Sequence, residues 1–213
     1  MAEPRFVTCT ESDVPDGDDW LGPRERVVLA SLRSGPRRAS WRLGRWTAKL
    51  LLAAPDEAPA RVEILREPDG SPRPYRDGAP LDVTLSISHR AGRGLAATAP
   101  GQVALGCDLE RIEPRSPAFV ADFFTAREAE AVAVAAEPEL VANLIWSAKE
   151  AALKALRVGL GRDTRELEVD FTPDGRLAVD DAGGGAMRGS WRRDGRDVLT
   201  FVVAPGTPRS RDP

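Results

Sequence analysis

The sequence has little histidine and cysteine, and it has no long apolar segment. His89 is the single histidine, which excludes a histidine-rich metal site or a His-pair proton relay. Cys9 and Cys107 are too few for a disulfide framework, so we expect both to be free thiols. No apolar run approaches the roughly 20 residues that a membrane helix needs, so we expect no membrane span.

The chain also lacks excess positive charge and a targeting signal. Its 213 residues carry a net charge of -3, which excludes the global basic field typical of nucleic-acid-binding proteins. The N-terminal residues are polar and acidic, unlike a secretory signal. We therefore expect a cytoplasmic protein that binds no nucleic acid. Lysine occurs only at Lys49, Lys149 and Lys154, and the sequence leaves open whether these positions need a compact ammonium group or are ordinary helix-surface lysines.

Similar residues recur at a spacing of 105 positions, which indicates an internal repeat. The matched positions, in a register without gaps, are Trp41 with Trp146, Lys49 with Lys154, Glu63 with Glu168, and residues 68–70 with 173–175. Each copy predicts a helix, an extended segment and an Asp-Gly hairpin turn. We therefore predict an α/β (α+β) fold with two similar halves, residues 1–103 and 104–205, and a disordered tail at 206–213.

Carboxylates gather on two predicted elements of the second half. Residues 103–109 alternate between apolar and other side chains, so Asp108 and Glu110 leave the same face of a strand and can share one hard cation. Glu150 lies beside an apolar helical stripe over residues 141–156 and could supply a third ligand. Three carboxylates without clustered His or Cys favour magnesium or manganese over zinc. The alternative is a solvated strand end, with Glu150 paired to Lys154 on the helix surface.

His89 ends a predicted strand over residues 83–89, in which apolar residues alternate with Thr and Ser. It follows Ser88 and precedes a glycine-containing loop, so it could donate a hydrogen bond to an anion together with nearby backbone amides. A purely structural role for this histidine is the alternative.

Three segments together resemble the ordered motifs of the Sfp-type 4'-phosphopantetheinyl transferase family. They are Ser-Ile-Ser-His at 86–89, Gly-Cys-Asp-Leu-Glu at 106–110, and Trp-Ser-Ala-Lys-Glu-Ala at 146–151 with Lys154. The Phe-Phe-Thr-x-x-Glu run at 123–128 is similar to the segment between the second and third motifs. The resemblance covers roughly residues 36–180. It implies the fold of that family, with two halves related by pseudo-twofold symmetry and the active site between them, in a monomer rather than a half-length trimer.

The resemblance also implies roles for individual residues in binding coenzyme A. Asp108, Glu110 and Glu150 would hold magnesium (or manganese) against its pyrophosphate. The residues implied in contacts with its phosphates are His89 and Lys154, with Ser88 and Lys149 nearby. The residues implied in binding its 3'-phosphate are Arg38 and Arg45, with Arg42 or Lys49 as further candidates. Ser71 stands where the family often has a lysine, and Arg73 is the candidate replacement.

The implied reaction moves phosphopantetheine from coenzyme A to a serine of an apo acyl or peptidyl carrier protein, releasing 3',5'-ADP. Such carriers serve fatty-acid, polyketide or nonribosomal-peptide assembly, including secondary metabolite biosynthesis. Glu150, Lys154 and His89 are the implied catalytic residues, with Glu150 as general base, directly or through water. Residues 111–127, which include Arg115, Phe119, Phe123 and Phe124, are the candidate carrier-docking segment. The alternatives are a magnesium-dependent nucleotide or coenzyme A hydrolase and a non-catalytic coenzyme A-binding protein.

Overall fold

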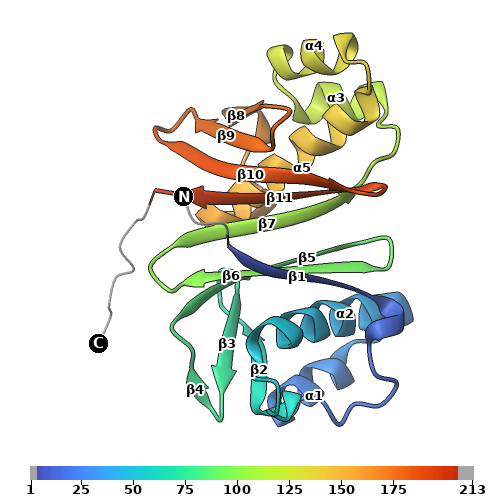
Figure 1. Cartoon of the computed structure of the whole chain (residues 1–213), viewed down its shortest axis with the longest axis vertical. Helices are drawn as coiled ribbons and strands as arrows, with labels where there is room; N and C mark the ends of the chain where they lie inside the picture. The colour runs from blue at the N-terminus through green and yellow to red at the C-terminus, as the bar shows by residue number, and fades with distance from the viewer. Residues whose placement is uncertain (1–3, 206–213) are drawn as a thin grey trace. The chain divides into compact units, whose positions relative to one another are not determined.

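The computed structural model describes residues 4–205, apart from the side chain of residue 160, and the predicted tail at 206–213 lies outside this range. The chain divides into two compact units, Met1–Gly101 (unit 1) and Gln102–Pro213 (unit 2). Helices and antiparallel strands occur in both (Figure 1), which confirms the predicted mixed α/β fold class. Within residues 4–205, no helix has the length and apolar character needed to cross a membrane. Cys9 and Cys107 are buried free thiols.

Unit 1 consists of two short sheets and two helices. Its elements are β1 (Arg5–Thr10), α1 (Pro23–Ser31), α2 (Gly35–Leu52), β2 (Val62–Arg66), β3 (Pro72–Arg76), β4 (Ala79–Pro80), β5 (Val83–Arg90) and β6 (Arg93–Pro100). One sheet has the order β1-β6-β5 and the other β2-β3-β4, and all pairings are antiparallel. Helix α2 packs against β1, β5 and β6, and its buried residues Ala48 and Leu51 join Val62, Ile64 and Leu85 in one apolar core.

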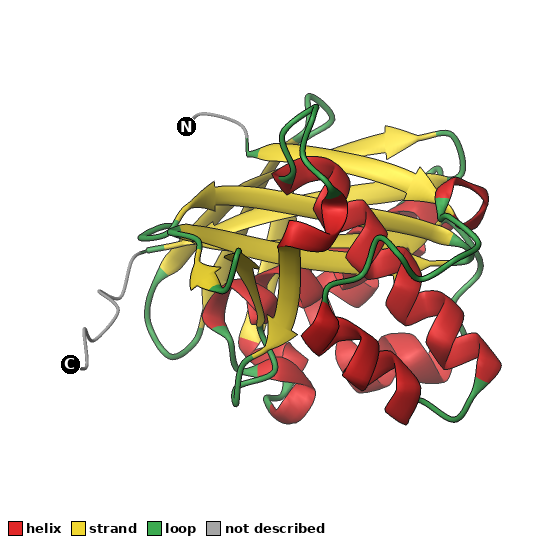
Figure 2. Ribbon diagram, turned by 90° about the horizontal axis from the view of Figure 1, so that it is seen from below, coloured by secondary structure: helices red, strands yellow, loops and turns green. Residues whose placement is uncertain are grey.

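Unit 2 is built on one larger sheet. Its elements are β7 (Ala104–Arg111), α3 (Pro117–Phe123), α4 (Ala126–Val134), α5 (Pro138–Leu156), β8 (Leu167–Phe171), β9 (Arg176–Asp181), β10 (Ala186–Asp194) and β11 (Asp197–Ala204). The antiparallel sheet has the order β7-β11-β10-β9-β8. Helix α5 packs on β7 and β11. Figure 2 shows the helices in red and the strands in yellow. The predicted apolar stripe of α5 is buried, as Ala148, Ala152 and Ala155 show.

The two units repeat one order of elements. In unit 1 the order is β1-α1-α2-β2-β3-β5-β6, and in unit 2 it is β7-α4-α5-β8-β9-β10-β11. The strand pairs β1·β6, β5·β6 and β2·β3 correspond to β7·β11, β10·β11 and β8·β9. Strand β4 and helix α3 lie outside the shared order.

A buried lysine–glutamate ion pair occupies the equivalent place in each unit. The Lys49 Nζ–Glu25 Oε2 and Lys149 Nζ–Glu128 Oε2 distances are both 2.7 Å, and the four side chains are at most 2% exposed. Each glutamate also accepts a backbone N–H from the start of its own helix and another from the following hairpin strand. The pair therefore fastens the long helix, the preceding short helix and the hairpin to one another.

These contacts correct the gap-free register that the sequence predicted. Lys49 and Lys149 are equivalent and lie 100 positions apart, whereas Ile64 and Val169, whose amides bond the paired glutamates, lie 105 apart. The spacing of 105 holds for the hairpins but not for the helices. The match of Lys49 with Lys154 was therefore wrong, because unit 2 has five extra residues between its long helix and its hairpin.

Candidate active site

Gly106 on β7 lets α5 approach the strand that carries the acidic motif. A Cβ atom at Gly106 would lie 1.9 Å from the carbonyl oxygen of Ala151 and 2.7 Å from the backbone nitrogen of Ala155. The alternation along β7 turns Asp108 and Glu110 toward the same side as Gly106. The close approach of helix and strand therefore brings the carboxylates of β7 to the side chains of α5.

A Gly106→Ala substitution is expected to destabilise the protein by about 3 kcal/mol, because the added methyl meets backbone that cannot rotate away. It should also slow any reaction that needs Asp108 beside α5. Urea unfolding followed by circular dichroism measures the stability. Gly161→Ala is the matched control, since its Cβ would have no neighbour within 4 Å. Equal stability of the two variants would contradict this packing.

Lys154 and Asp108 form an ion pair between α5 and β7. The Lys154 Nζ–Asp108 Oδ1 distance is 2.7 Å, and the same ammonium group donates to the carbonyl oxygen of Cys107 at 3.1 Å. Burial disfavours the charged ammonium group. The electrostatic interactions of Lys154 with Asp108 and Cys107 outweigh this effect and raise its pKa. Lys154 therefore stays positively charged, with 30% of its side chain exposed.

Glu150 lies one helical turn before Lys154 and has an altered protonation equilibrium. Burial is the largest cause that raises its pKa to about 7, and repulsion from Asp108 is the second. Lys154 partly opposes this shift, and Glu110 adds a smaller repulsion. The charges of Asp108 and Glu110 thus act on Glu150. Near neutral pH, without a bound cation, both protonation states of Glu150 are therefore populated.

The chemistry of these donors fits a hard divalent cation. Three carboxylates are the ligands that Mg²⁺ and Mn²⁺ prefer. Burial is the main cause of the raised pKa of Glu150, and a cation would relieve the repulsion from Asp108 and Glu110 that adds to it. Across residues 4–205, no three acidic, histidine or cysteine side chains converge closely enough to enclose a metal ion. The three carboxylates are therefore the candidate ligands, and in the structure the positive charge paired with Asp108 is that of Lys154.

Lys149 is placed differently from the predicted contact with coenzyme A. Its side chain is fully buried, and besides Glu128 its ammonium group donates to the carbonyl oxygens of Phe123 and Thr164 at 3.1 and 2.8 Å. Burial lowers its pKa, and Glu128 opposes this shift only in part. A lysine with three interior partners cannot reach a bound ligand, so the structure gives Lys149 a role in stability.

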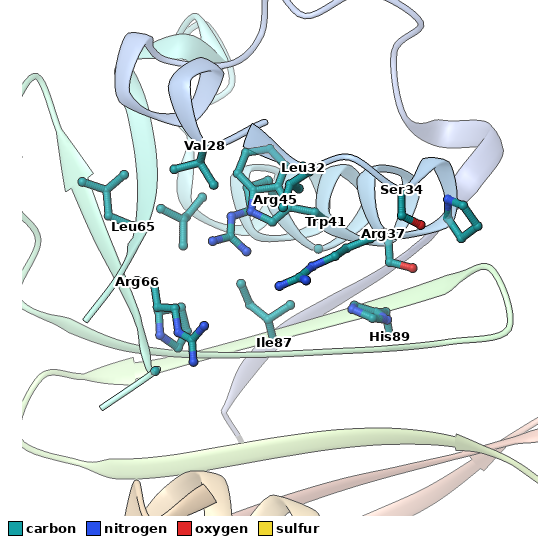
Figure 3. Close-up of a pocket in the computed structure, with 16 residues that line it drawn as sticks. Val28, Leu32, Ser34, Arg37, Trp41, Arg45, Leu65, Arg66, Ile87 and His89 are labelled. Carbon is teal, nitrogen blue, oxygen red and sulfur yellow. The ribbon is translucent and has the colours of Figure 1, made fainter. Parts of the chain in front are cut away.

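Unit 1 contains a positively charged pocket of about 800 Å³. Arg37 and Arg45 extend into it from α2, Arg66 enters from the end of β2, and His89 lies on β5 (Figure 3). There is no carboxylate among the described residues that line it. The remaining wall is largely apolar and includes Trp41. Basic groups on an apolar wall suit an anionic ligand with an aromatic or aliphatic part.

Arg45 is a partly buried arginine of this pocket. Its guanidinium lies 4.6 Å from the centre of the Trp41 ring, and its buried Nε has no hydrogen-bond partner among the described residues. Burial lowers the pKa of Arg45; Glu25 opposes this and Arg66 adds to it. An anion in the pocket would offset the cost of holding Arg45 and Arg66 together.

Most of the residues predicted to bind the 3'-phosphate do not line this pocket. Arg38 donates to the carbonyl oxygen of Leu29 at 2.6 Å, and Arg42 pairs with Asp18. Lys49 is the buried partner of Glu25. Other predicted residues that do not line the pocket are Ser88, which is buried, and Arg73. Of the predicted residues, Arg45 and His89 line it.

Sequence reasoning missed Arg37 and Arg66. Arg37, Trp41 and Arg45 recur every four residues, so their helical spacing could have identified Arg37. Arg66 comes from a separate strand, and no local sequence pattern links it to α2.

A comparison with protein-family models finds a match in the second half of the chain. Residues 104–201 match the family model of the 4'-phosphopantetheinyl transferase superfamily (ACPS). The match contains Asp108, Glu110, Glu150 and Lys154. No curated protein sequence matches the chain.

Solved structures with similarity to the chain include two holo-[acyl-carrier-protein] synthases (AcpS). The Thermotoga maritima enzyme is 21% identical with a TM-score of 0.42, and the match covers 49% of this chain and 65% of that chain. The Neisseria meningitidis enzyme is 20% identical with a TM-score of 0.43, and the match covers 48% and 98%. The chain thus spans just under two thirds of the Thermotoga protein.

Proposed function

We propose that this protein is a magnesium-dependent 4'-phosphopantetheinyl transferase of the Sfp type. It transfers phosphopantetheine from coenzyme A to a serine of an apo carrier protein and releases 3',5'-ADP. The observation that carries the proposal is the cluster of Asp108, Glu110, Glu150 and Lys154 within the segment that matches the superfamily model. A coenzyme A-binding protein without activity would not need this combination of coupled carboxylates and a paired lysine.

Unit 1 supplies the binding of coenzyme A in this proposal. Arg37, Arg45 and Arg66 have the charge and the fork geometry that phosphate recognition uses. The apolar pocket wall fits the adenosine part, and His89 donates a hydrogen bond to a phosphate oxygen. The lysine that the family often has where this chain has Ser71 is not needed for this arrangement, because the three arginines already provide the positive charge.

Unit 2 supplies the chemistry of transfer. The carrier serine oxygen forms a bond to the phosphorus that bears the pantetheine arm, while the bond from that phosphorus to the bridging oxygen of 3',5'-ADP breaks. Glu150 accepts the serine proton, directly or through water. Lys154 neutralises charge that develops on the phosphate oxygens. When bound by Asp108, Glu110 and Glu150, Mg²⁺ would supply further charge neutralisation at the pyrophosphate.

Release of 3',5'-ADP distinguishes this proposal from coenzyme A hydrolysis. Chromatography of coenzyme A incubated with the protein and Mg²⁺ should show 3',5'-ADP only when an apo carrier protein is added. Release at the same rate without a carrier would favour the hydrolase instead, and binding without release in either case would favour a non-catalytic coenzyme A-binding protein.

An Arg45→Ala variant is expected to bind coenzyme A about 10- to 100-fold more weakly, because it loses a charge-assisted contact to the 3'-phosphate. Binding of dephospho-coenzyme A, which lacks that phosphate, should change much less. Isothermal titration calorimetry of both ligands measures the difference. Arg61→Ala is the control, since Arg61 is 55% exposed and pairs with Asp77 outside the pocket. Equal losses for both ligands would contradict the assignment of Arg45.

A further inference from the structure

Arg115 connects the acidic motif of β7 to two other parts of unit 2. Its Nη2 donates to Glu110 Oε2 at 2.8 Å, and its Nε donates to Asn143 Oδ1 at 2.7 Å. The Arg115 and Glu110 side chains are only 13% and 11% exposed. A partly buried arginine with two guanidinium nitrogens bonded to fixed partners has little freedom to rotate.

Asn143 is a rigid support for this arginine. It is fully buried on α5, and its Nδ2 donates to the carbonyl oxygens of Glu113 and Glu139 at 2.7 and 2.8 Å. These two bonds fix the amide so that Oδ1 is the atom presented to Arg115. Asn143 lies two helical turns before Glu150 on the same helix. The orientation of Glu110 is thereby tied to the helix that carries Glu150.

The Arg115 guanidinium also contacts α3. Arg115 lies 4.7 Å from the centre of the Phe119 ring. Phe119 in turn packs against Phe123 and Trp146, with ring centres 4.9 and 5.0 Å away. The Phe119 ring therefore limits the positions that the guanidinium can take. Arg115 is the side chain that links α3 to Glu110.

We propose that Arg115 is a positioning residue that fixes the Glu110 carboxylate for binding a divalent cation and transmits the packing of α3 to it. The inference rests on the proposed function, in which Glu110 is a cation ligand. Groups that orient a metal ligand typically change metal affinity by about 10- to 100-fold when they are replaced. The guanidinium fork supplies this orientation, because it bonds Glu110 and Asn143 at once.

The decisive substitution is Arg115→Lys, which retains the positive charge and removes the fork. A lysine cannot reproduce two bonds of fixed relative direction, so Glu110 gains rotational freedom without a change in net charge. We expect about tenfold weaker binding of Mn²⁺, measured by electron paramagnetic resonance of the free ion. The activation constant for Mg²⁺ should rise by a similar factor, with kcat restored at saturating Mg²⁺.

Two further variants separate positioning from loss of structure. Phe119→Leu keeps apolar volume but removes the ring beside the guanidinium, and we expect about threefold weaker Mn²⁺ binding, less than for Arg115→Lys. Arg127→Lys is the control, because Arg127 is 64% exposed and pairs with Glu168 and Asp170 instead. Its Mn²⁺ affinity should equal that of the wild type. Thermal unfolding of each variant by circular dichroism reports whether the fold is retained.

The outcomes distinguish this inference from the proposed function. Unchanged Mn²⁺ affinity in a folded Arg115→Lys variant of an active enzyme overturns the role of Arg115 and leaves the transferase in place. A loss of affinity that only follows a matching loss of thermal stability also overturns it, because Arg115 would then be merely structural. If the wild type transfers phosphopantetheine without binding Mn²⁺ or Mg²⁺, both the role of Arg115 and the metal dependence are wrong.

Discussion

A Lys149→Met variant is expected to lose about 3–5 kcal/mol of unfolding free energy, the typical cost of breaking a buried ion pair from one side. Lys149 and Glu128 are 0% and 2% exposed and lie 2.7 Å apart. Methionine preserves the length of the side chain but leaves the Glu128 carboxylate buried without its cation. The carbonyl oxygens of Phe123 and Thr164 also lose a donor. Urea unfolding at neutral pH measures the change.

A double variant identifies the origin of this loss. Glu128→Gln combined with Lys149→Met removes both charges, so the double variant should be more stable than the sum of the two single effects implies. If Lys149 instead contacted coenzyme A, Lys149→Met would keep its stability and raise the KM for coenzyme A. That result would contradict the interior role of Lys149. Lys49→Met tests the equivalent pair of unit 1 in the same way.

A Glu150→Gln variant is expected to transfer phosphopantetheine at least about 100-fold more slowly, because glutamine cannot accept the proton of the carrier serine. Glutamine preserves the shape of the side chain, so the fold should remain. Single-turnover transfer at saturating coenzyme A and carrier measures the rate directly. An unchanged rate would exclude Glu150 as both base and essential cation ligand. Glu137→Gln is a suitable control, since Glu137 is 58% exposed and pairs with Arg193.

The same substitution should stabilise the metal-free protein. The pKa of Glu150 is about 7 in the folded state against an ordinary value of 4.5, so the unfolded chain loses this proton first as pH rises. Stability therefore falls between about pH 4.5 and 7 and stays low above pH 7. Glu150→Gln should recover up to about 3 kcal/mol at pH 8 in the presence of EDTA, and nothing below pH 4.5. Equal stability of the two proteins at pH 8 would contradict the raised pKa of Glu150 that burial and the neighbouring carboxylates cause.

Patterns within one element gave reliable expectations of the fold. The alternation in residues 83–89 corresponds to β5, and the apolar stripe over residues 141–156 corresponds to most of α5. Strand and helix periods differ, so a local pattern is enough to recognise each element. The pairing of Asp108 and Glu110 on one face could be predicted for the same reason.

Register between the halves could not be predicted from matching residue types. Lys49 and Lys154 are both lysines on corresponding helices, but burial and ion pairing make Lys149 the equivalent of Lys49. Only the ion-pair partners, Glu25 and Glu128, reveal this equivalence. Each glutamate lies on a different helix from the lysine that it pairs with. Two residues of the same type match in sequence, but they are structurally equivalent only if they make the same contacts with residues distant in the sequence.

The binding pocket of unit 1 illustrates the same limit. Arg38 and Arg42 resemble Arg37 and Arg45 in sequence, but each is held by protein groups of its own. Arg66 enters the pocket because β2 ends beside α2, which is a tertiary relationship. A cluster of arginines in a sequence therefore indicates a basic surface without identifying which members face a ligand.

The most direct test of the proposed transferase is the intact mass of an apo carrier protein after incubation with the wild-type protein, coenzyme A and Mg²⁺. We predict a mass gain of one phosphopantetheine group on the carrier serine, and no gain when EDTA replaces Mg²⁺ or when the carrier serine is replaced by alanine. A carrier that keeps its apo mass, across acyl and peptidyl types and while coenzyme A binds, would contradict the proposed function.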